Sequence, residues 1–319
     1  MIAAAANLSD FVLEKLRDNI VGLDTNKVIM CAIHTHTGPG YPRVGRSKGT
    51  RGSKSLLEQF LSEGKKYVER QNISNNPDII KGEEALYFLG EKITKVTLDA
   101  WAQRRDGSFT NAFGRASVGM CRRANYSDGS AQMWGETNQA VFTEVEGGSD
   151  TGIELLFVYD QNNKLKVMKL PLRRATLSQI NTAKREIHNY LSQKEGDVDF
   201  NDAAKLQVHT GILAREALQN IQNVVDTEVH TIKLGSVAIA TNPFELFLNY
   251  GNQIKARSHA EQTFLIQLAN GIEGYFPTEK AEKGGHYSAF VSSRLVGHEG
   301  GYQLVRETLE HINNELFPL

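Results

Sequence analysis

Cysteine and tryptophan are scarce in this chain, which has two of each among 319 residues. With only Cys31 and Cys121, the sequence offers neither a disulfide framework nor a zinc site built from several thiolates. It also lacks an apolar run long enough to cross a bilayer. The first residues lack the basic start and long apolar region of a signal peptide. From these absences we expect a cytoplasmic protein without a transmembrane segment.

A strong charge of either sign is missing as well. The 36 Lys and Arg residues balance 37 Asp and Glu residues, for a net charge of −1. No broad electrostatic field therefore favours nucleic acid or an anionic membrane. The sequence has no Walker A loop, H-E-x-x-H motif or G-x-G-x-x-G fingerprint, so nucleotide chemistry has no support. No nucleic-acid partner is expected, and the oligomeric state is left open.

Hydrophobic periodicity switches between helical and strand-like spacing along the whole chain. It predicts helices at residues 8–21, 56–70, 83–105, 176–194, 203–224, 244–256 and 301–317. It predicts strands at residues 28–33, 113–120, 152–160, 164–170, 228–234, 236–241 and 263–268, with 152–160 and 164–170 forming a hairpin. This mixture predicts a single mixed α/β or α+β domain in which helices flank β-sheets.

The most informative segment is His34-Thr35-His36, which ends the apolar run at 28–33 and precedes Thr37-Gly38-Pro39-Gly40. Side chains alternate across a strand, so both imidazoles are predicted to point to the same face where the chain turns. Paired histidines at a strand end are typical of metal sites. The alternative is two polar residues that bond to loop backbone at a strand exit.

A second segment, Asn242-Pro243-Phe244-Glu245, follows the strand predicted at 236–241. Asn242 suits the N-cap of a helix, Pro243 its first position, and Glu245 the third position of a capping box. This capping role is favoured from the residues alone. Strand-to-helix turns are also where α/β proteins place site residues, so metal binding by Glu245 remains the alternative.

Two further segments carry candidate residues. Tyr275, His286 and Tyr287 lie in a glycine-punctuated region after the strand predicted at 263–268, where packing or surface roles are the simpler interpretation. Arg122 and Arg123 follow the strand predicted at 113–120, where an arginine can bind a carboxylate or support an oxyanion, or simply be solvated. The G-x-S-x-G match at residues 45–49 lacks the strand and helix of a nucleophile elbow and is set aside.

Taken together, these segments resemble the neutral, non-lysosomal ceramidase family. Residues 33–40 match its Thr-His-Thr-His-Ser-Gly-Pro-Gly stretch, and the resemblance is strongest at residues 230–305. It implies one ceramidase-like catalytic domain over residues 1–319, shortened at the N-terminus and with an apparent internal deletion near residue 170. It implies a zinc-dependent amidohydrolase that cleaves the amide of an N-acyl sphingoid base, or a related small or lipid amide, by a zinc-activated water.

The resemblance also implies roles for individual residues. His34, Glu245 and Tyr275 match zinc ligands, and His36 matches a histidine that faces the substrate carbonyl. Tyr287 matches a tyrosine near the scissile amide. The active-site arginine is matched best by Arg122, with Arg123 as the alternative, so the catalytic set is His36, Arg122 and Tyr287.

This chain departs from the family pattern in its middle. Family members carry a second zinc histidine and a Gly-Asp-x-Ser-Pro-like segment, whereas here the strand at 164–170 runs directly into Pro171. Three ligands can still make a catalytic site with an open position. Two hypotheses follow: an active zinc amidohydrolase, or a degenerate, non-catalytic relative that keeps the fold and a binding role.

Overall fold

The computed structural model describes residues 4–36, 40–41, 54–68, 79–80, 82–104, 109–157, 164–171 and 173–319. Its helices are α1 (Ala6–Asn19), α2 (Lys54–Glu58), α3 (Gly82–Ala102), α4 (Leu177–Gln193), α5 (Phe200–Gln219), α6 (Leu248–Arg257), α7 (Glu279–Gly284) and α8 (His298–Glu310). Its strands are β1 (Thr110–Arg115), β2 (Arg123–Tyr126), β3 (Ala131–Met133), β4 (Phe142–Val145), β5 (Gly152–Phe157), β6 (Lys164–Pro171), β7 (Val224–Leu234), β8 (Val237–Thr241), β9 (Glu245–Leu246), β10 (Gln262–Ile266) and β11 (Tyr275–Phe276). The mixed α/β class is confirmed.

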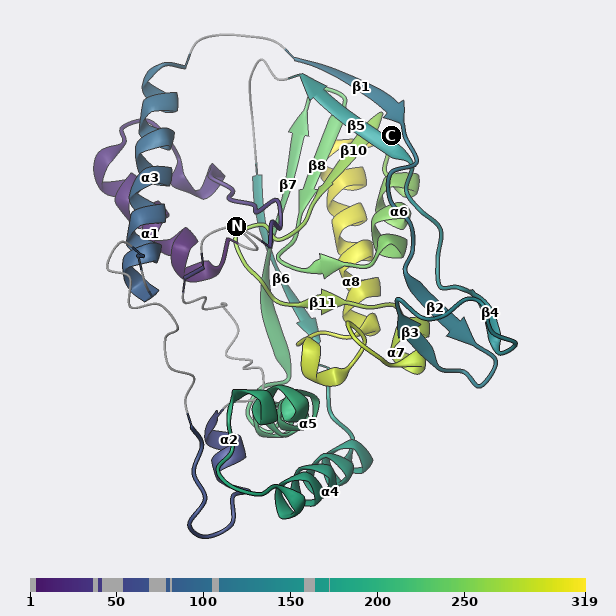
Figure 1. Cartoon of the computed structure of the whole chain (residues 1–319). Coiled ribbons are helices and arrows are strands. Elements are labelled where there is room, and N and C mark those ends of the chain that lie inside the picture. The colour runs from purple at the N-terminus through teal and green to yellow at the C-terminus, as the bar shows by residue number, and fades with distance from the viewer. Residues whose placement is uncertain are drawn as a thin grey trace.

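A four-stranded sheet of order β10-β8-β7-β6 forms the centre of the molecule. β10 pairs with β8 in parallel, whereas β7 pairs antiparallel with both β8 and β6. Gly235 turns the chain between β7 and β8 with a φ of 60°, a conformation that costs glycine little. Figure 1 shows α6 and α8 together against this sheet, with β9 and β11 beside its lower end.

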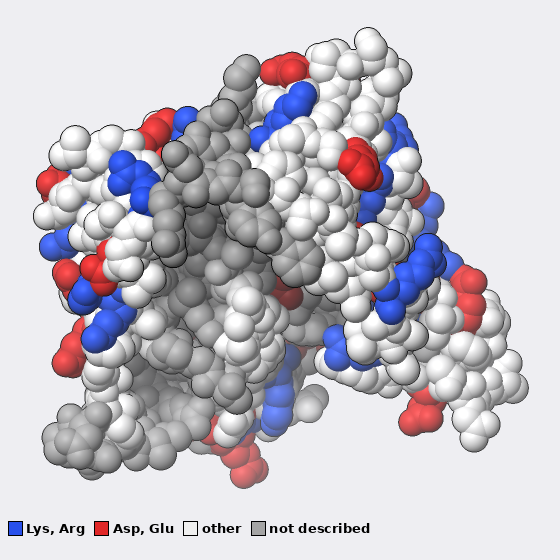
Figure 2. All heavy atoms as spheres, turned by 90° about the horizontal axis from the view of Figure 1, so that it is seen from above, with Lys and Arg blue, Asp and Glu red and all other residues white. Residues whose placement is uncertain are grey.

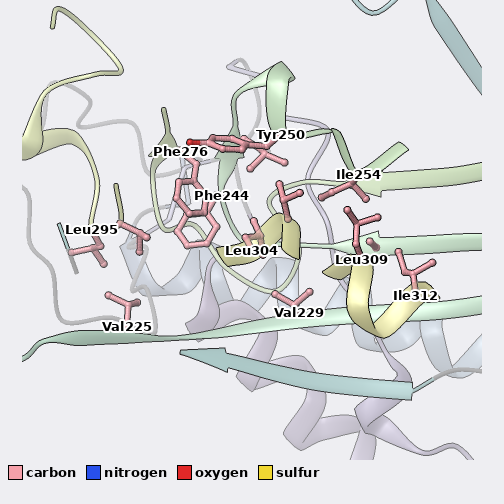
Figure 3. Packing of buried hydrophobic residues seen from close by; sticks show 14 of the residues in the cluster. Val225, Val229, Phe244, Tyr250, Ile254, Phe276, Leu295, Leu304, Leu309 and Ile312 are labelled. Atoms are coloured by element: carbon pink, nitrogen blue, oxygen red, sulfur yellow. The ribbon is translucent and has the colours of Figure 1, made fainter. Parts of the chain in front are cut away.

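The largest hydrophobic core fills the space between this sheet, α6 and α8. Phe244, Tyr250 and Phe276 are fully buried there, and the rings of Phe244 and Phe276 are 4.4 Å apart. The Tyr250 hydroxyl donates to the Pro277 carbonyl over 2.8 Å, which satisfies its one polar group. Figure 3 shows these aromatic rings beside side chains from α8 and β7. Because Phe244 and Phe276 are adjacent to Glu245 and Tyr275, the core fixes both flanks of the candidate site.

Two smaller cores and two small sheets complete the fold. One core lies under α2, α4 and α5, and the other between α1 and α3. β1 pairs with β5, and β2 pairs with β3 and β4. In Figure 1 the α1–α3 pair and the β2-β3-β4 sheet lie on opposite sides of the central sheet. The β2-β3-β4 sheet was not predicted, because its strands are only three or four residues long.

Most of the long elements agree with the sequence prediction. The helices predicted at 8–21, 83–105, 176–194 and 203–224 are α1, α3, α4 and α5, and the strands at 228–234 and 236–241 are β7 and β8. α4 and α5 both begin with capping boxes, at Thr176 and Asp199. The last predicted helix begins earlier, as α8, and ends in a π-helical turn, His311–Leu316.

The strand predicted at 28–33 is wrong. Residues 28–36 contain one isolated bridge, from Cys31 to Ala269, and none of them is buried. Ile33 is 86% exposed. The apolar run was mistaken for a core strand because its length and β-branching match one, while the core positions are taken by β7 and β8.

Three other predictions are corrected. The helix predicted at 56–70 ends at Glu58 as α2, and the strand predicted at 113–120 is β1, Thr110–Arg115. The hairpin of 152–160 with 164–170 does not form, because β5 pairs with β1 whereas β6 pairs with β7. Its predicted turn, the Gly38-Pro39 step and the match at 45–49 lie outside the described residues.

Within the described ranges, no helix combines the length and apolar character needed to cross a membrane. Basic and acidic side chains are interspersed on the face shown in Figure 2, without a continuous area of one sign among its described residues. This matches the balanced composition.

Asp202, in the first turn of α5, accepts hydrogen bonds from the Tyr190 hydroxyl (2.6 Å) and the Asp199 N–H (2.9 Å), and Lys194 lies 3.1 Å away. Burial is the largest influence and opposes ionisation, but these contacts together outweigh it and lower the pKa of Asp202 to about 2.

We predict that Asp202→Asn lowers the free energy of unfolding by roughly 2 kcal/mol at pH 7. A carboxyl group whose pKa is depressed on folding stabilises the fold above its unfolded pKa, about 3.9. The difference from wild type should therefore shrink as the pH falls from about 4 towards about 2. Urea unfolding at several pH values measures it, with exposed Asp197→Asn as the control; a difference independent of pH would contradict the prediction.

Candidate active site

A two-residue parallel pairing between β9 and β11 sets Glu245 directly opposite Tyr275. The Glu245 N–H donates to the Gly274 carbonyl over 3.0 Å. Gly274 has a φ of 82°, and a Cβ atom there would lie 2.6 Å from the Ser293 carbonyl oxygen. Only glycine meets both conditions, so Gly274 allows the close approach that places Tyr275 beside Glu245.

The capping role expected for Glu245 is wrong. α6 begins at Leu248, and Glu245 lies in β9. The Asn242 carboxamide oxygen accepts the Phe244 N–H over 3.0 Å, which makes a tight turn instead of a helix N-cap. Burial of Phe244 and pairing with β11 outweigh the local helix signal. The Glu245 carboxylate consequently faces the site, with its side chain 18% exposed.

Asn270 holds the histidine segment, residues 30–36, against the rest of the fold. Its side-chain oxygen accepts the Met30 N–H and its own N–H donates to the Met30 carbonyl, each over 2.7 Å. Its amide nitrogen donates to Glu228 over 2.8 Å, and Glu228 lies 2.9 Å from the buried ring of His230. This polar network anchors the backbone four residues before His34.

His34 and His36 lie together although no strand holds them. Their rings are 5.0 Å apart and meet edge to face. The His34 Nε2 atom lies 3.8 Å from a Glu245 carboxylate oxygen. His34 reaches this position with a φ of 56°, which a strand does not allow. The structure thus brings the two histidines to Glu245 by a different backbone path from the one predicted.

The two tyrosines form a hydrogen-bonded pair. The Tyr275 and Tyr287 hydroxyl oxygens are 2.8 Å apart, and the rings meet edge to face. Burial raises the pKa of Tyr275 well above its ordinary value, and the hydrogen bond to Tyr287 and the negative charge of Glu245 act in the same direction. Tyr275 is therefore a neutral phenol at pH 7 in this arrangement and can donate a hydrogen bond.

Trp134 extends this cluster to Arg122. Its indole ring stacks on Tyr287, with centroids 6.5 Å apart. The Arg122 guanidinium lies over the Trp134 ring, 5.0 Å from the ring centroid, in a cation–π contact. Trp134 is 64% exposed. Sequence reasoning missed it because a lone tryptophan outside any predicted element has no distinguishing pattern.

Arg123, the alternative to Arg122, has a different setting. It is 3% exposed and its Nε atom bonds Glu146 over 2.7 Å. Its remaining nitrogens donate to backbone carbonyls, including those of Gly285 (2.8 Å) and Tyr287 (3.2 Å). Arg123 thus holds the tyrosine loop, residues 285–288, through its backbone, whereas Arg122 contacts Trp134, which stacks on Tyr287.

The candidate residues therefore form one chain of contacts that joins segments far apart in the sequence. In order, it runs through His36, His34, Glu245, Tyr275, Tyr287, Trp134 and Arg122. His286, which the sequence left as a surface residue, is half-buried and accepts the Met133 N–H over 3.1 Å. It braces β3 against the tyrosine loop.

Backbone strain is concentrated in the same loops. Among the described residues, every non-glycine residue with positive φ belongs to a segment around this cluster: His34, Trp134, Leu268, Asn270, His286 and Ser288. Each such conformation costs of order 1–3 kcal/mol and persists only where the surroundings over-determine it. Clustering of this kind is typical of functional sites.

Among the described residues, no group of three or more His, Cys, Asp and Glu side chains is placed to hold a metal ion. The implied set of His34, Glu245 and Tyr275 has one nitrogen donor and two oxygen donors, all of types that zinc accepts or tolerates. Two ligand atoms on a tetrahedral zinc ion lie roughly 3.3 Å apart, given bonds of about 2.0–2.1 Å. The 3.8 Å between His34 and Glu245 is close to that spacing. His34 and Glu245 therefore fit a shared ion after a small adjustment, and Tyr275 lies opposite Glu245 in the β9–β11 pairing.

No protein-family profile and no curated protein sequence matches this chain. Solved structures do. The crystal structure of neutral ceramidase from Pseudomonas aeruginosa matches with a TM-score of 0.50 at 11% identity, over 100% of this chain and 66% of that one. A ceramidase complexed with C2 matches with a TM-score of 0.50 at 10% identity, over 97% of this chain and 65% of that one.

The fold is ceramidase-like. The chain spans just under two thirds of the length of these structures, with 65% and 66% covered. At such low identity the likeness establishes the fold, and the resemblance drawn from the sequence motifs is confirmed at that level. What the individual side chains do is a separate question.

We predict that Asn270→Ala destabilises the fold and loosens the histidine segment. The change leaves the Met30 N–H without its side-chain acceptor and removes one hydrogen bond from Glu228, at a typical cost of about 1–3 kcal/mol, and alanine tolerates the φ of 51° less well than asparagine. Urea unfolding measures the loss, with exposed Asn249→Ala as the control. Equal stability of the two variants would show that Asn270 does not anchor this segment.

Proposed function

We propose that this chain is a zinc-dependent amidohydrolase that acts on a lipid amide, of the N-acyl sphingoid type or a related small amide. The observation that carries the proposal is the chain of contacts from His36 to Arg122. Four segments distant in sequence bring together the residues that the motifs single out. The ceramidase-like fold supports the substrate class.

His34, Glu245 and Tyr275 would hold the zinc ion. When bound, zinc supplies Lewis-acid chemistry, because it polarises a carbonyl oxygen and lowers the pKa of water. The three residues leave a position open for substrate, as in other catalytic zinc sites. The carboxylate of Glu245 is essential to the set, since it is the only one of the three donors that carries a full negative charge before the ion binds.

The remaining residues act on the substrate and its charge. His36, in edge-to-face contact with His34, would face the substrate carbonyl and exchange a proton with the reacting groups. Tyr287 can donate a hydrogen bond towards the amide while Tyr275 fixes its orientation. Arg122 places a positive charge beside Trp134, where it can attract a developing oxyanion or a polar head group.

We predict that purified protein binds about one zinc ion per chain and that His34→Ala reduces the affinity. The reduction should exceed the roughly 10–100-fold that loss of an outer-shell partner typically causes. Calorimetric titration with zinc after chelator treatment measures the affinity. His188→Ala, which changes an exposed histidine on α4, is the matched control and should bind zinc like wild type. Wild-type protein without bound zinc would contradict the assignment.

We predict that His36→Ala retains zinc but loses hydrolysis. The expected decrease in kcat is roughly 10²–10⁴-fold, the usual contribution of a positioned acid–base group. Release of fatty acid from a panel of N-acyl sphingoid bases and simpler N-acyl amines measures the activity. Zinc-dependent release by wild type that His36→Ala leaves unchanged would remove His36 from the mechanism.

The second candidate function is a non-catalytic relative that keeps the fold and a binding role. The observation that favours it is the lack of a three-residue His, Cys, Asp or Glu metal cluster within the described part of the chain. Under this alternative the same panel shows no zinc-dependent release, while an N-acyl amide still raises the Tm by binding the folded state.

A further inference from the structure

A buried group of donors lies beneath the tyrosine loop and takes no part in the proposed chemistry. Arg294 is 2% exposed and Ser288 is fully buried. The Arg294 Nη1 atom donates to the Ser288 carbonyl. Among the described residues, the buried Arg294 Nε and Nη2 atoms and the Ser288 hydroxyl have no hydrogen-bond partner. The bond from Arg294 to the Ser288 carbonyl puts the two residues in contact, and each of them has at least one donor left over.

The charge around these donors is unbalanced. Arg173 and Arg215 are packed against Arg294, and Arg215 donates to the backbone carbonyls of both. The carboxylate that acts on Arg173 and Arg294 is Glu282, which lies 3.5 Å from Arg173 and is also hydrogen-bonded to His298 over 2.8 Å. The two buried guanidinium groups of Arg215 and Arg294 and the partly exposed one of Arg173 therefore meet one carboxylate within the described part of the chain, an excess of about two positive charges.

Nearby Arg123 does not change this balance, since Glu146 neutralises it at 2.7 Å. The unbalanced charge also affects the pKa values of these arginines. Burial and the neighbouring guanidinium groups lower the pKa of Arg294 well below its usual range, and burial followed by the charge of Arg173 lowers the pKa of Arg215 to about 10. In both groups burial is the largest cause of the lowered pKa, and the positive charge of neighbouring guanidinium groups adds to it.

We propose that a small monovalent inorganic anion of chloride size binds here, held by the Arg294 Nε and Nη2 atoms and the Ser288 hydroxyl. An ordered water molecule could accept the orphaned hydrogens, but it would leave the excess positive charge in place. An anion satisfies the donors and the charge together. A small ion is required because both residues are closed off from solvent.

The position of the ion gives it a structural role. Ser288 directly follows Tyr287 and has a φ of 65°, and His286 on the other side has a φ of 68°. An anion bonded to Ser288 would hold this strained turn closed, and with it the Tyr287 ring. The site is separate from the proposed zinc ligands and does not depend on the proposed activity.

Thermal unfolding of the full chain in halide-free gluconate buffer, titrated with chloride or bromide at constant ionic strength, tests the proposal. We expect the Tm to rise and to saturate with halide, because a ligand that binds only the folded state stabilises it. Ser288→Ala, which removes one donor and keeps the cation, should shift the halide midpoint to higher concentration. Arg306→Met, at an exposed arginine of α8, should respond like wild type.

Arg294→Met removes the cation and two donors, so its Tm should not depend on halide; if this variant fails to fold, Ser288→Ala carries the comparison. Crystals grown in bromide should show an anomalous peak in contact with Arg294 and Ser288. A wild-type Tm that is the same in gluconate and halide, or a water molecule without anomalous signal at that position, would overturn the proposal.

Discussion

The pairing of β9 with β11 is the contact on which the rest of the site depends. It is only two residues long, yet it places a carboxylate and a phenol side by side, with the carboxylate near His34 and the phenol bonded to Tyr287. The aromatic core beneath it, built from Phe244, Tyr250 and Phe276, holds both strands from the opposite side. A short pairing of this kind has little stability of its own, so its precision comes from packing.

Around that pairing the fold tolerates several unfavourable arrangements. Left-handed residues occupy the site loops, a half-buried phenol lies beside a carboxylate, and Arg173 and Arg294 share one acidic partner. Each is costly alone. They persist because the central sheet and α8 provide a large, well-packed core at a distance from the loops. The scaffold and the site thus have opposite properties, one relaxed and the other strained.

The sequence predicted the scaffold better than the site. Long amphipathic helices and the β7–β8 hairpin follow from periodicity and capping, which are local. The strand expected before His34 and the helix expected at Phe244 failed, because distant partners decide both: Asn270 for the first, β11 for the second. The site residues were recognised as motifs, but their geometry could not be predicted, and Trp134 carried no signal at all.

The bond between Met30 and Asn270 joins residues 240 positions apart. Nearly the whole chain must be folded before the histidine segment can be held in place, since closing so long a loop has a high entropic cost until other contacts form. The cluster is consequently a feature of the finished fold, completed late on the folding pathway. A partly folded chain would contain all of the residues of this cluster and none of its geometry.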